Sequence, residues 1–503
     1  MSLASLIQVI DTSIVNVAIP HMMGELGANI DEIAWVTTGY ILASVVVIPM
    51  SGWLSGFFGR KRYFTTSIIV FTVSSFFCGA SGSLHALIFW RIVQGIGGGA
   101  LLPTSQALIY EAFPREEIGT ALAVFGLGVM VGPTIGPTLG GFLTDNYSWP
   151  WIFYINLPIG LAAAVMVSLY VRDSPHQAKA SRIDYVGIAF LTVCVSALQY
   201  LVEHGQRDDW FQSSFMTTLA VIGIVTAIAL VWRELTIPEP VIDFRVLRHR
   251  DVWIGVVIGI VFGVGLFGSV FVLPIFLQNM LRMTAWQTGM VILPGAIMTA
   301  ISMAITGRIS NRVDARLLIA TGTSMFFWSM WQLSHITIQA GTRDFFWPLI
   351  WRGLGLGLMF VPLTNITLAD LSPRELPTGA ALSVFFRQLG GSFGVAAMAT
   401  LLTRFAAQAH AVLSEHVTAY DPISRERLSM LTNGFMSRGM DAQSARQMAL
   451  TALDRQLMGH ANVIAFSKVY VLSGLILLAC VPLLLFVKNT TPGSGGRAPP
   501  HSE

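Results

Sequence analysis

Charged residues are scarce in this sequence. Asp, Glu, Lys and Arg make up 11% of its 503 residues, against roughly 25% in a typical soluble domain. Hydrophobic residues account for 54% of the chain. The 30 basic and 27 acidic residues nearly cancel, so the formal net charge of +3 gives no reason to expect a nucleic-acid partner. This composition argues against a soluble globular protein.

Cysteine is rare too, and several catalytic motifs are missing. The three cysteines, Cys78, Cys194 and Cys480, all fall in apolar segments, which excludes a disulfide framework and a zinc site. The sequence contains no His-Glu-x-x-His and no Gly-x-Ser-x-Gly, and none of its lysines follows a glycine as a phosphate-binding loop requires. We therefore expect neither an enzyme nor an ATP-driven pump, and no cofactor.

Long apolar runs are abundant. A helix that crosses a hydrocarbon core about 30 Å thick needs about 20 residues. Stretches of that length without a charged residue are 33–59, 63–90, 118–144, 146–171, 185–202, 210–232, 252–281, 283–307 and 317–342. The second contains a Gly/Ser turn at 79–83 and divides into two helices. Three more segments carry one charge each, at Asp11, Arg352 and Arg387, and the last begins at Lys468. We predict an all-α integral membrane protein with 14 transmembrane helices.

The distribution of Lys and Arg predicts the orientation. Basic residues gather in alternate loops, beginning with the turn at 60–62, and such loops face the cytoplasm. Both termini then lie in the cytoplasm. The long polar segment at about 404–462 lies outside, where its spaced apolar residues predict short amphipathic helices interrupted at Asp421-Pro422. The Pro/Gly/Ser tail at 489–503 is expected to be disordered.

The chain contains an internal repeat. PTSQALIYEAFPRE at 103–116 matches PLTNITLADLSPRE at 362–375 with a constant offset of 259 residues, and Arg91 with its following glycines echoes Arg352 with its glycines. The repeat predicts two homologous six-helix bundles, as in transporters built from parallel repeats. We place the bundles at 1–172 and 251–488, two additional helices with their linkers at 173–250, and the cytoplasmic tail at 489–503.

Four motifs carry a resemblance to a known family. They are DTSIVNVAIP at 11–20, GWLSGFFGRKR at 52–62, RIVQGIG at 91–97 and GVMVGPTIGPTLGG at 128–141. Together they resemble the fourteen-helix drug:proton antiporters of the major facilitator superfamily, and EmrB-type inner-membrane efflux pumps in particular. The resemblance covers nearly the whole chain. It implies a major-facilitator fold with two extra helices, and export of amphiphilic drugs or toxic compounds in exchange for protons.

Two of these motifs supply groups of candidate functional residues. The inner-loop motif between the second and third helices contributes Gly52, Gly59, Arg60, Lys61 and Arg62. The antiporter motif of the fifth predicted helix contributes Gly128, Gly132, Pro133, Gly136, Pro137, Gly140 and Gly141. Glycines let membrane helices approach closely, and prolines remove backbone hydrogen bonds, so this helix should bend at a fixed place. In the family, such a helix seals one end of a central cavity.

Three positions depart from the family pattern. Gly56 replaces the aspartate usual in the inner-loop motif, which puts the usual charge contact of that loop in doubt. Pro150 stands where the entry to the sixth helix usually has an arginine, and Lys468 stands where similar pumps often have an acidic residue. Each departure could change the charge of the preferred substrate without changing the fold.

Asp11 is the candidate proton site. It lies in an otherwise apolar helix, where keeping a carboxylate ionised costs several kcal/mol unless it is paired or hydrated. An aspartate that faces an alternating aqueous cavity can take up a proton on one side of the membrane and release it on the other. The alternative is a structural hydrogen bond to neighbouring helices. Asn16, about one turn along on a similar face, is a candidate for the substrate cavity.

Arg91 is the second candidate for proton coupling. No carboxylate stands three or four residues away in its helix, so its partner must come from another helix. The resemblance implicates this arginine in proton transfer, and the alternative is a guanidinium that binds free carbonyl groups. Gln94, three residues on, shares its face and is also a candidate for the cavity.

Arg352 and Arg387 complete the candidate cavity residues. With Arg91 and Lys468, they outnumber Asp11 within or near the membrane, which favours amphiphilic anions or weak acids as substrates. Alternatively, carbonyl groups or the carboxylates of Glu111 and Asp370 neutralise the two arginines.

The expected partners are small amphiphilic substrates, protons and the lipid bilayer of the inner membrane. Similar EmrB-type pumps dock to a periplasmic adaptor protein, and through it to an outer-membrane channel, and the long outer segment offers a surface for this. A competing role for that segment is to cap the cavity. The alternative to transport is a membrane sensor or scaffold of an efflux assembly that does not itself transport.

Overall fold

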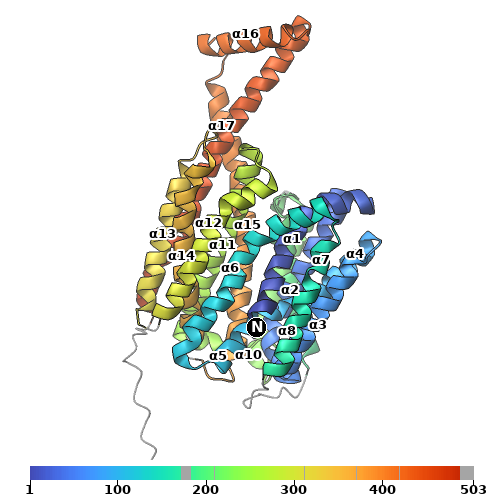
Figure 1. Cartoon of the computed structure of the whole chain (residues 1–503), viewed down its shortest axis with the longest axis vertical. Helices are drawn as coiled ribbons and strands as arrows, with labels where there is room; N and C mark the ends of the chain where they lie inside the picture. The colour runs from blue at the N-terminus through green and yellow to red at the C-terminus, as the bar shows by residue number, and fades with distance from the viewer. Residues whose placement is uncertain (172–182, 209, 311, 370, 419, 488–503) are drawn as a thin grey trace, which may run out of the picture.

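The computed structural model describes residues 1–171, 183–208, 210–310, 312–369, 371–418 and 420–487. All regular elements in these ranges are helices, which confirms the all-α prediction. The predicted disordered tail lies outside the described residues, as does much of the linker before the additional helices. Figure 1 shows the helices side by side, with a hairpin projecting from one end.

The helices of the first half run back and forth along a common direction (Figure 1). Their bounds are α1 (Ser2–Leu26), α2 (Ile30–Phe58), α3 (Arg60–Gly79), α4 (Leu84–Gly99), α5 (Leu101–Ala112), α6 (Arg115–Asn146), α7 (Trp151–Tyr154) and α8 (Asn156–Tyr170). Their ends are set by local sequence. Asn29, for example, begins α2 with a reciprocal capping box that includes Glu32.

The second half repeats this pattern after an additional pair. The pair is α9 (Tyr185–His204) and α10 (Ser214–Thr236), and the later helices are α11 (Arg250–Ile275), α12 (Ala285–Ile309), α13 (Ala315–Ser334), α14 (Phe346–Leu368), α15 (Leu376–Glu415), α16 (Pro422–Met436) and α17 (Ala442–Leu478). Short 3-10 or π turns, such as Phe276–Met280, join or extend some of them.

Eleven helices of the described residues are long and apolar enough to cross a membrane. A twelfth is gained if the bent halves of α6, Glu116–Met130 and Ile135–Asn146, form one span; they meet at 43°, around Pro133, where a bend was predicted. The count of 14 is not reached because α3 and α13, with 20 residues each, have basic residues in their first turn and carry several serines and threonines, all of which lower their mean hydropathy.

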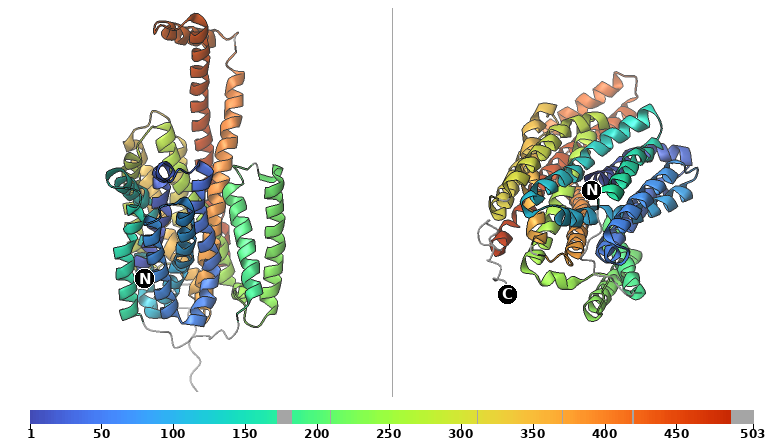
Figure 2. Two further views of the ribbon diagram at one scale, coloured as in Figure 1. Left: turned by 90° about the vertical axis from the view of Figure 1, so that its right-hand side faces the viewer. Right: turned by 60° about the horizontal axis from the view of Figure 1, so that its bottom comes forward.

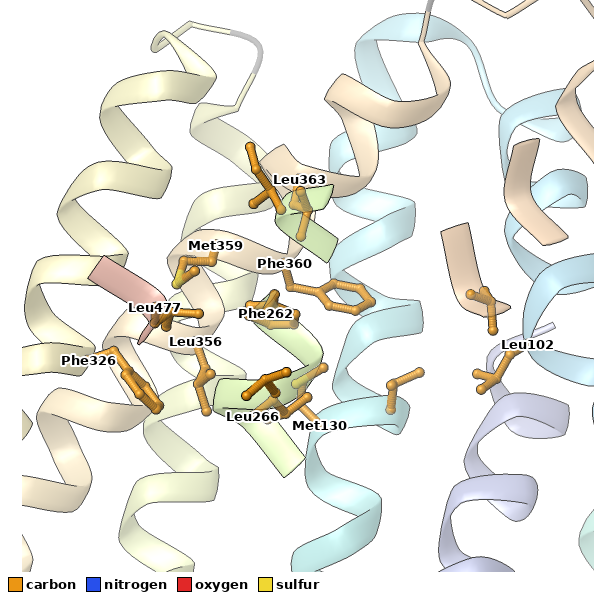
Figure 3. Close-up of a cluster of buried hydrophobic side chains, with 14 of the residues drawn as sticks. Leu102, Met130, Phe262, Leu266, Phe326, Leu356, Met359, Phe360, Leu363 and Leu477 are labelled. Atoms are coloured by element: carbon orange, nitrogen blue, oxygen red, sulfur yellow. The ribbon is translucent and has the colours of Figure 1, made fainter. Parts of the chain in front are cut away.

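The two halves pack along a shared seam. Helix α6 packs against both α1 and α12, and α2 packs against α15. Phe125 of α6 stacks on Phe360 of α14 with ring centroids 6.4 Å apart. Figure 3 shows Phe360 in a cluster with Phe262 and Met130, so apolar side chains from both halves share one core.

The additional pair α9–α10 stands beside this seam, as the left view of Figure 2 shows. Thr38 Oγ1 of α2 donates to Glu203 Oε1 at 2.9 Å, and Gln199 Nε2 donates to Ser392 Oγ of α15, also at 2.9 Å. Arg207, after α9, also forms an ion pair with Asp31. Helix α9 therefore contacts both halves of the molecule.

The outer segment differs from the prediction of several short helices. Helix α15 continues for 40 residues and α17 for 37, so both extend beyond the other helices as an antiparallel pair with α16 across the top (Figures 1 and 2). A contact between His410 Nε2 of α15 and Asp454 Oδ1 of α17 at 2.9 Å links the pair, and the alanines buried along the two helices are Ala406, Ala409, Ala445 and Ala449. The predicted break is confirmed, since Asp421 caps α16 by accepting the N–H of Ser424 at 2.9 Å.

Candidate functional site

Asp11 lies at the centre of a buried polar cluster. Its side chain is fully buried in α1 and accepts hydrogen bonds from three side chains. Arg91 Nη1 donates to Oδ2 at 2.7 Å, while Gln94 Nε2 and Asn156 Nδ2 donate to Oδ1 at 2.9 and 2.8 Å. The donors come from α4 and α8, so the carboxylate ties three helices together.

The Arg91 guanidinium is held from several sides. Nε donates to the Val36 carbonyl at 3.0 Å, and Nη1 also donates to Gln94 Oε1 at 2.7 Å. The Cζ atom lies 4.2 Å from the centre of the Tyr40 ring, an arrangement that stabilises a cation. The sequence required a partner from another helix, and Asp11 is that partner. The carbonyl of Val36 shows that the alternative interpretation also describes part of the contact.

A second layer of polar groups surrounds this ion pair. Asn156 Nδ2 also donates to Ser75 Oγ at 3.1 Å, and Ser75 Oγ donates to the Phe153 carbonyl at 2.9 Å. Cys78 Sγ donates weakly to Gln94 Oε1 at 3.6 Å. Sequence reasoning did not select Asn156 or Ser75. The sequence feature that could have identified Asn156 is its amide side chain in the middle of an apolar run that contains no charged residue.

The glycines of α4 bring this cluster together. A Cβ atom on Gly95 would lie 2.5 Å from the Tyr40 carbonyl oxygen of α2, and one on Gly97 would lie 2.6 Å from the Phe71 nitrogen of α3. These glycines let α4 pack closely against α2 and α3. In the second half, Gly255 and Gly263 are also in tight contacts, with Thr367 and Arg387, but Gly259 has no neighbour within 4 Å and does not share this role.

The antiporter motif packs α6 directly onto α1. Added Cβ atoms would meet Val9 at 2.7 Å from Gly132 and Ile14 at 2.8 Å from Gly140, and one on Gly136 would overlap the Ser13 hydroxyl. Ser13 Oγ also donates to the Gly132 carbonyl at 3.4 Å. Gly128 contacts Leu6 in the same way, whereas Gly141 makes only an ordinary contact with Val17. This stripe of glycines fixes the helix that carries Asp11.

The inner-loop motif joins the two halves at the end opposite the hairpin. Arg60 forms an ion pair with Glu111, and its Nη2 donates to the Pro373 carbonyl at 2.8 Å. A Cβ on Gly52 would lie 3.0 Å from the backbone of Thr378 at the start of α15. Gly59 has a φ of 89°, which favours glycine. Lys61 is partly exposed and Arg62 is exposed.

The remaining candidates do not join the Asp11 cluster. Asn16 is exposed while Asp11 is buried, so the expectation of a similar face is wrong. Five residues turn a helix by about 140°. Gln94 belongs to the ion-pair cluster instead of an open cavity. Arg352 and Arg387 are buried in α14 and α15, where the structure records no ion pair for either with a carboxylate of the described ranges.

The sequence suggested Glu111 or Asp370 as partners of Arg352 and Arg387, and the structure tests only the first of these. Glu111 pairs with Arg60 and is not their partner, and Asp370 lies outside the described residues. Arg387 Cζ lies 5.3 Å from the centre of the Phe360 ring.

The structure gives the surroundings of two residues that depart from the family pattern. Pro150 directly precedes α7, and Lys468 is exposed with its Nζ 5.3 Å from the centre of the Phe405 ring.

Comparison with known proteins identifies the family. The sequence model of the Major Facilitator Superfamily matches residues 1–395. The chain belongs to this superfamily. It is 34% identical over 508 aligned positions to the multidrug export protein EmrB of Escherichia coli K12, covering 100% of this chain and 96% of that protein. It is 29% identical to the fatty acid resistance protein FarB of Neisseria gonorrhoeae, covering 99% and 96%.

A solved structure supports the major-facilitator fold. The human organic anion transporter MFSD10 (TETRAN) aligns with a TM-score of 0.58 at 12% identity, covering 95% of this chain and 97% of that one. With the superfamily match, this makes the molecule a multi-pass membrane transporter and not an enzyme. The all-helical major-facilitator fold is confirmed, while the count of 14 transmembrane helices and the roles of individual residues stay predictions.

Proposed function

We propose that this protein is a proton-coupled antiporter that exports amphiphilic drugs or toxic compounds across the inner membrane. The observation that carries the proposal is the fully buried Asp11, paired with Arg91 and surrounded by three donors. The two relatives named above, a multidrug export protein and a fatty acid resistance protein, support export.

The coupling step is a change of partner at Asp11. In the described state its charge is balanced by Arg91 at 2.7 Å. A proton on Asp11 removes that balance, and Arg91 then keeps the Val36 carbonyl, Gln94 and the rings of Tyr40 and Phe153, none of which carries a negative charge. Because a buried, unpaired guanidinium is unfavourable, protonation favours a rearrangement of α1 against α4. Alternating access follows if this rearrangement opens one side of the seam and closes the other.

The architecture belongs to the same proposal. Residues 1–172 and 251–488 form two bundles of six transmembrane helices, and 173–250 adds α9 and α10. Helices α3 and α13 complete 14 spans, since each is 20 residues long and packs among the other helices. Both termini face the cytoplasm, which places the hairpin of α15 and α17 outside.

The excess of buried cations favours lipophilic acids as cargo. Arg352 and Arg387 lie in the apolar interior with no paired carboxylate in the described ranges, and exposed Lys468 adds a third positive charge. The test is to compare the sensitivity of cells that lack the protein to lipophilic acids, such as decanoate, and to cationic dyes, such as ethidium. Greater loss of resistance to the dyes would contradict this preference.

Proton coupling is tested with Asp11→Asn in everted membrane vesicles. The amide nearly keeps the shape of the carboxyl group but cannot take up a proton, so export of a compound that the wild type transports should no longer respond to an imposed pH gradient. Protein level and melting temperature serve as controls for folding. A full response by this variant would show that Asp11 is not the coupling site.

The hairpin is the proposed docking surface for a periplasmic adaptor and, through it, an outer-membrane channel. It extends beyond the other helices and exposes Val412, Ile423, Met430 and Leu450. The test replaces 414–457 with a short polar linker. Docking predicts loss of adaptor pull-down and of cellular resistance, with transport in vesicles retained. A cap over the cavity instead predicts altered vesicle transport with adaptor binding intact.

A further inference from the structure

Arg352 is a buried cation without an acidic partner. It lies in the first third of α14. Its Nη1 atom has no hydrogen-bond partner in the described residues, and 6% of its surface remains accessible. Guanidinium groups do not deprotonate in proteins. A buried charge without a partner costs several kcal/mol of stability. A bound anion near Arg352 would therefore lower the free energy of the folded protein.

The other helices of the second half supply almost no carboxylate that could neutralise Arg352. Asp and Glu are absent from 252–313, 345–369, 376–414 and 455–487, which include almost all of α11, α12 and α14 and the membrane parts of α15 and α17. The acid nearest in sequence, Asp344, lies eight residues before Arg352, about 12 Å along a helix. It already accepts the Gly341 N–H at 2.8 Å.

A second buried polar group without a partner is the Tyr470 hydroxyl of α17. It has no hydrogen-bond partner in the described ranges and is within electrostatic range of the Arg352 guanidinium. Its ring lies among aromatic side chains, 6.4 Å from Phe466 and 6.5 Å from Phe276 between ring centroids. A cation and a free O–H donor in apolar surroundings form a site that an anion satisfies at both groups.

We propose that Arg352 and Tyr470 bind a monovalent anion inside the second half of the transporter. The anion accepts a charge-assisted hydrogen bond from the guanidinium and a second hydrogen bond from the phenol. Two sources share this chemistry: chloride from solution, and the acid group of an exported amphiphile. The second source rests on the proposed function, whereas the first does not.

The experiment measures the melting temperature of the purified full-length protein in lipid nanodiscs, without a proton gradient. Chloride replaces gluconate at constant ionic strength in one arm, and decanoate is added below its micellar concentration in the other. A ligand that binds only the folded state raises the melting temperature in a saturable way. We expect such a rise in at least one arm. Chloride alone identifies an inorganic anion, and decanoate alone identifies the acid group of a cargo.

Two variants test the residues. Arg352→Gln should abolish the rise, and Tyr470→Phe should raise the half-saturating anion concentration about 3- to 10-fold by removing one hydrogen bond. Tyr63→Phe, at another buried tyrosine whose hydroxyl has no partner in the described ranges, is the matched control and should respond as the wild type. The proposal is overturned if neither anion raises the melting temperature, or if both site variants keep the full response. Because no transport is measured, failure of proton coupling would leave these results unchanged.

Discussion

Arg91 and Arg352 occupy matching places in the two copies of the internal repeat, yet their surroundings differ. Arg91 donates to Asp11 and Gln94 and lies over Tyr40. Arg352 Nη1 has no hydrogen-bond partner in the described residues, and the Tyr470 phenol is within electrostatic range of this guanidinium. Both copies of the repeat therefore bury an arginine at this place, but within the described residues only Arg91 has a carboxylate as its partner.

The first helix of each half explains this difference. Asp11 lies in the middle of α1, whereas the only acidic residue of α11 is Asp251, at its first turn, and Gly265 lies in the middle of that helix. A Cβ on Gly265 would lie 3.1 Å from Leu477 of α17, so an apolar side chain takes the space near that position. The first half thus has a buried carboxylate for the proposed proton exchange, and the second half has none in the middle of its first helix.

The largest expected effect is a difference in stability between variants of Arg91 and Arg352. Arg91→Gln leaves Asp11 buried without its cation and should lower the free energy of unfolding by about 3–5 kcal/mol. Arg352→Gln removes an unpaired charge and should leave the stability in anion-free buffer unchanged or higher. Melting temperatures of both variants in nanodiscs check this. Equal destabilisation by the two changes would mean that Arg352 has a partner as strong as Asp11.

Asn156→Leu should have the next largest effect. It removes one of two donors to Asp11 Oδ1 and the contact with Ser75, and a hydrogen bond to a charged group contributes about 1.5–3 kcal/mol. We also expect the pH dependence of vesicle transport to shift, because the carboxylate loses a neighbour that favours its charged form. An unchanged pH profile with lowered stability would assign Asn156 a structural role only.

The antiporter motif offers a matched pair of glycines. Gly136→Ala places a methyl group against Ser13 and should cost about 1–3 kcal/mol and displace α1 with Asp11. Gly141→Ala is the control, since its Cβ would meet Val17 at 3.8 Å, an ordinary contact. Transport and melting temperature should both fall for the first change alone. If both alanines behave alike, close contact with α1 is not what the motif provides.

The smallest expected effect concerns the charge that links the halves. Arg60→Gln removes the ion pair with Glu111 and weakens the contact with Pro373. We expect a loss of about 1 kcal/mol in stability, because Arg60 is buried but the Glu111 side chain, 22% exposed, still reaches water. The rate of transport should change more than the stability does, since this contact joins the two halves. Accessibility of single cysteines near the seam measures the shift.

The sequence alone predicted the fold family, but not a confirmed number of membrane helices, and only part of the site. Long apolar runs, the repeat and the family motifs predicted the membrane helices, and the isolation of Arg91 in its helix predicted a partner elsewhere, which is Asp11. Asn156 and Tyr470 were missed because an amide or phenol in an apolar run has no spacing rule. Asn16 was misplaced because five residues differ by almost half a helical turn. The hairpin was misjudged because its alanine contacts show no strong amphipathic pattern.

The central claim is that Asp11, and no group of the second half, exchanges the coupled proton. It is tested most directly by proton release when substrate binds to the purified protein in weakly buffered solution with a pH-sensitive dye. The wild type should release protons on binding, Arg352→Gln should still release them if cargo binding is restored at higher concentration, and Asp11→Asn should release none. Release by Asp11→Asn equal to that of the wild type would contradict the account.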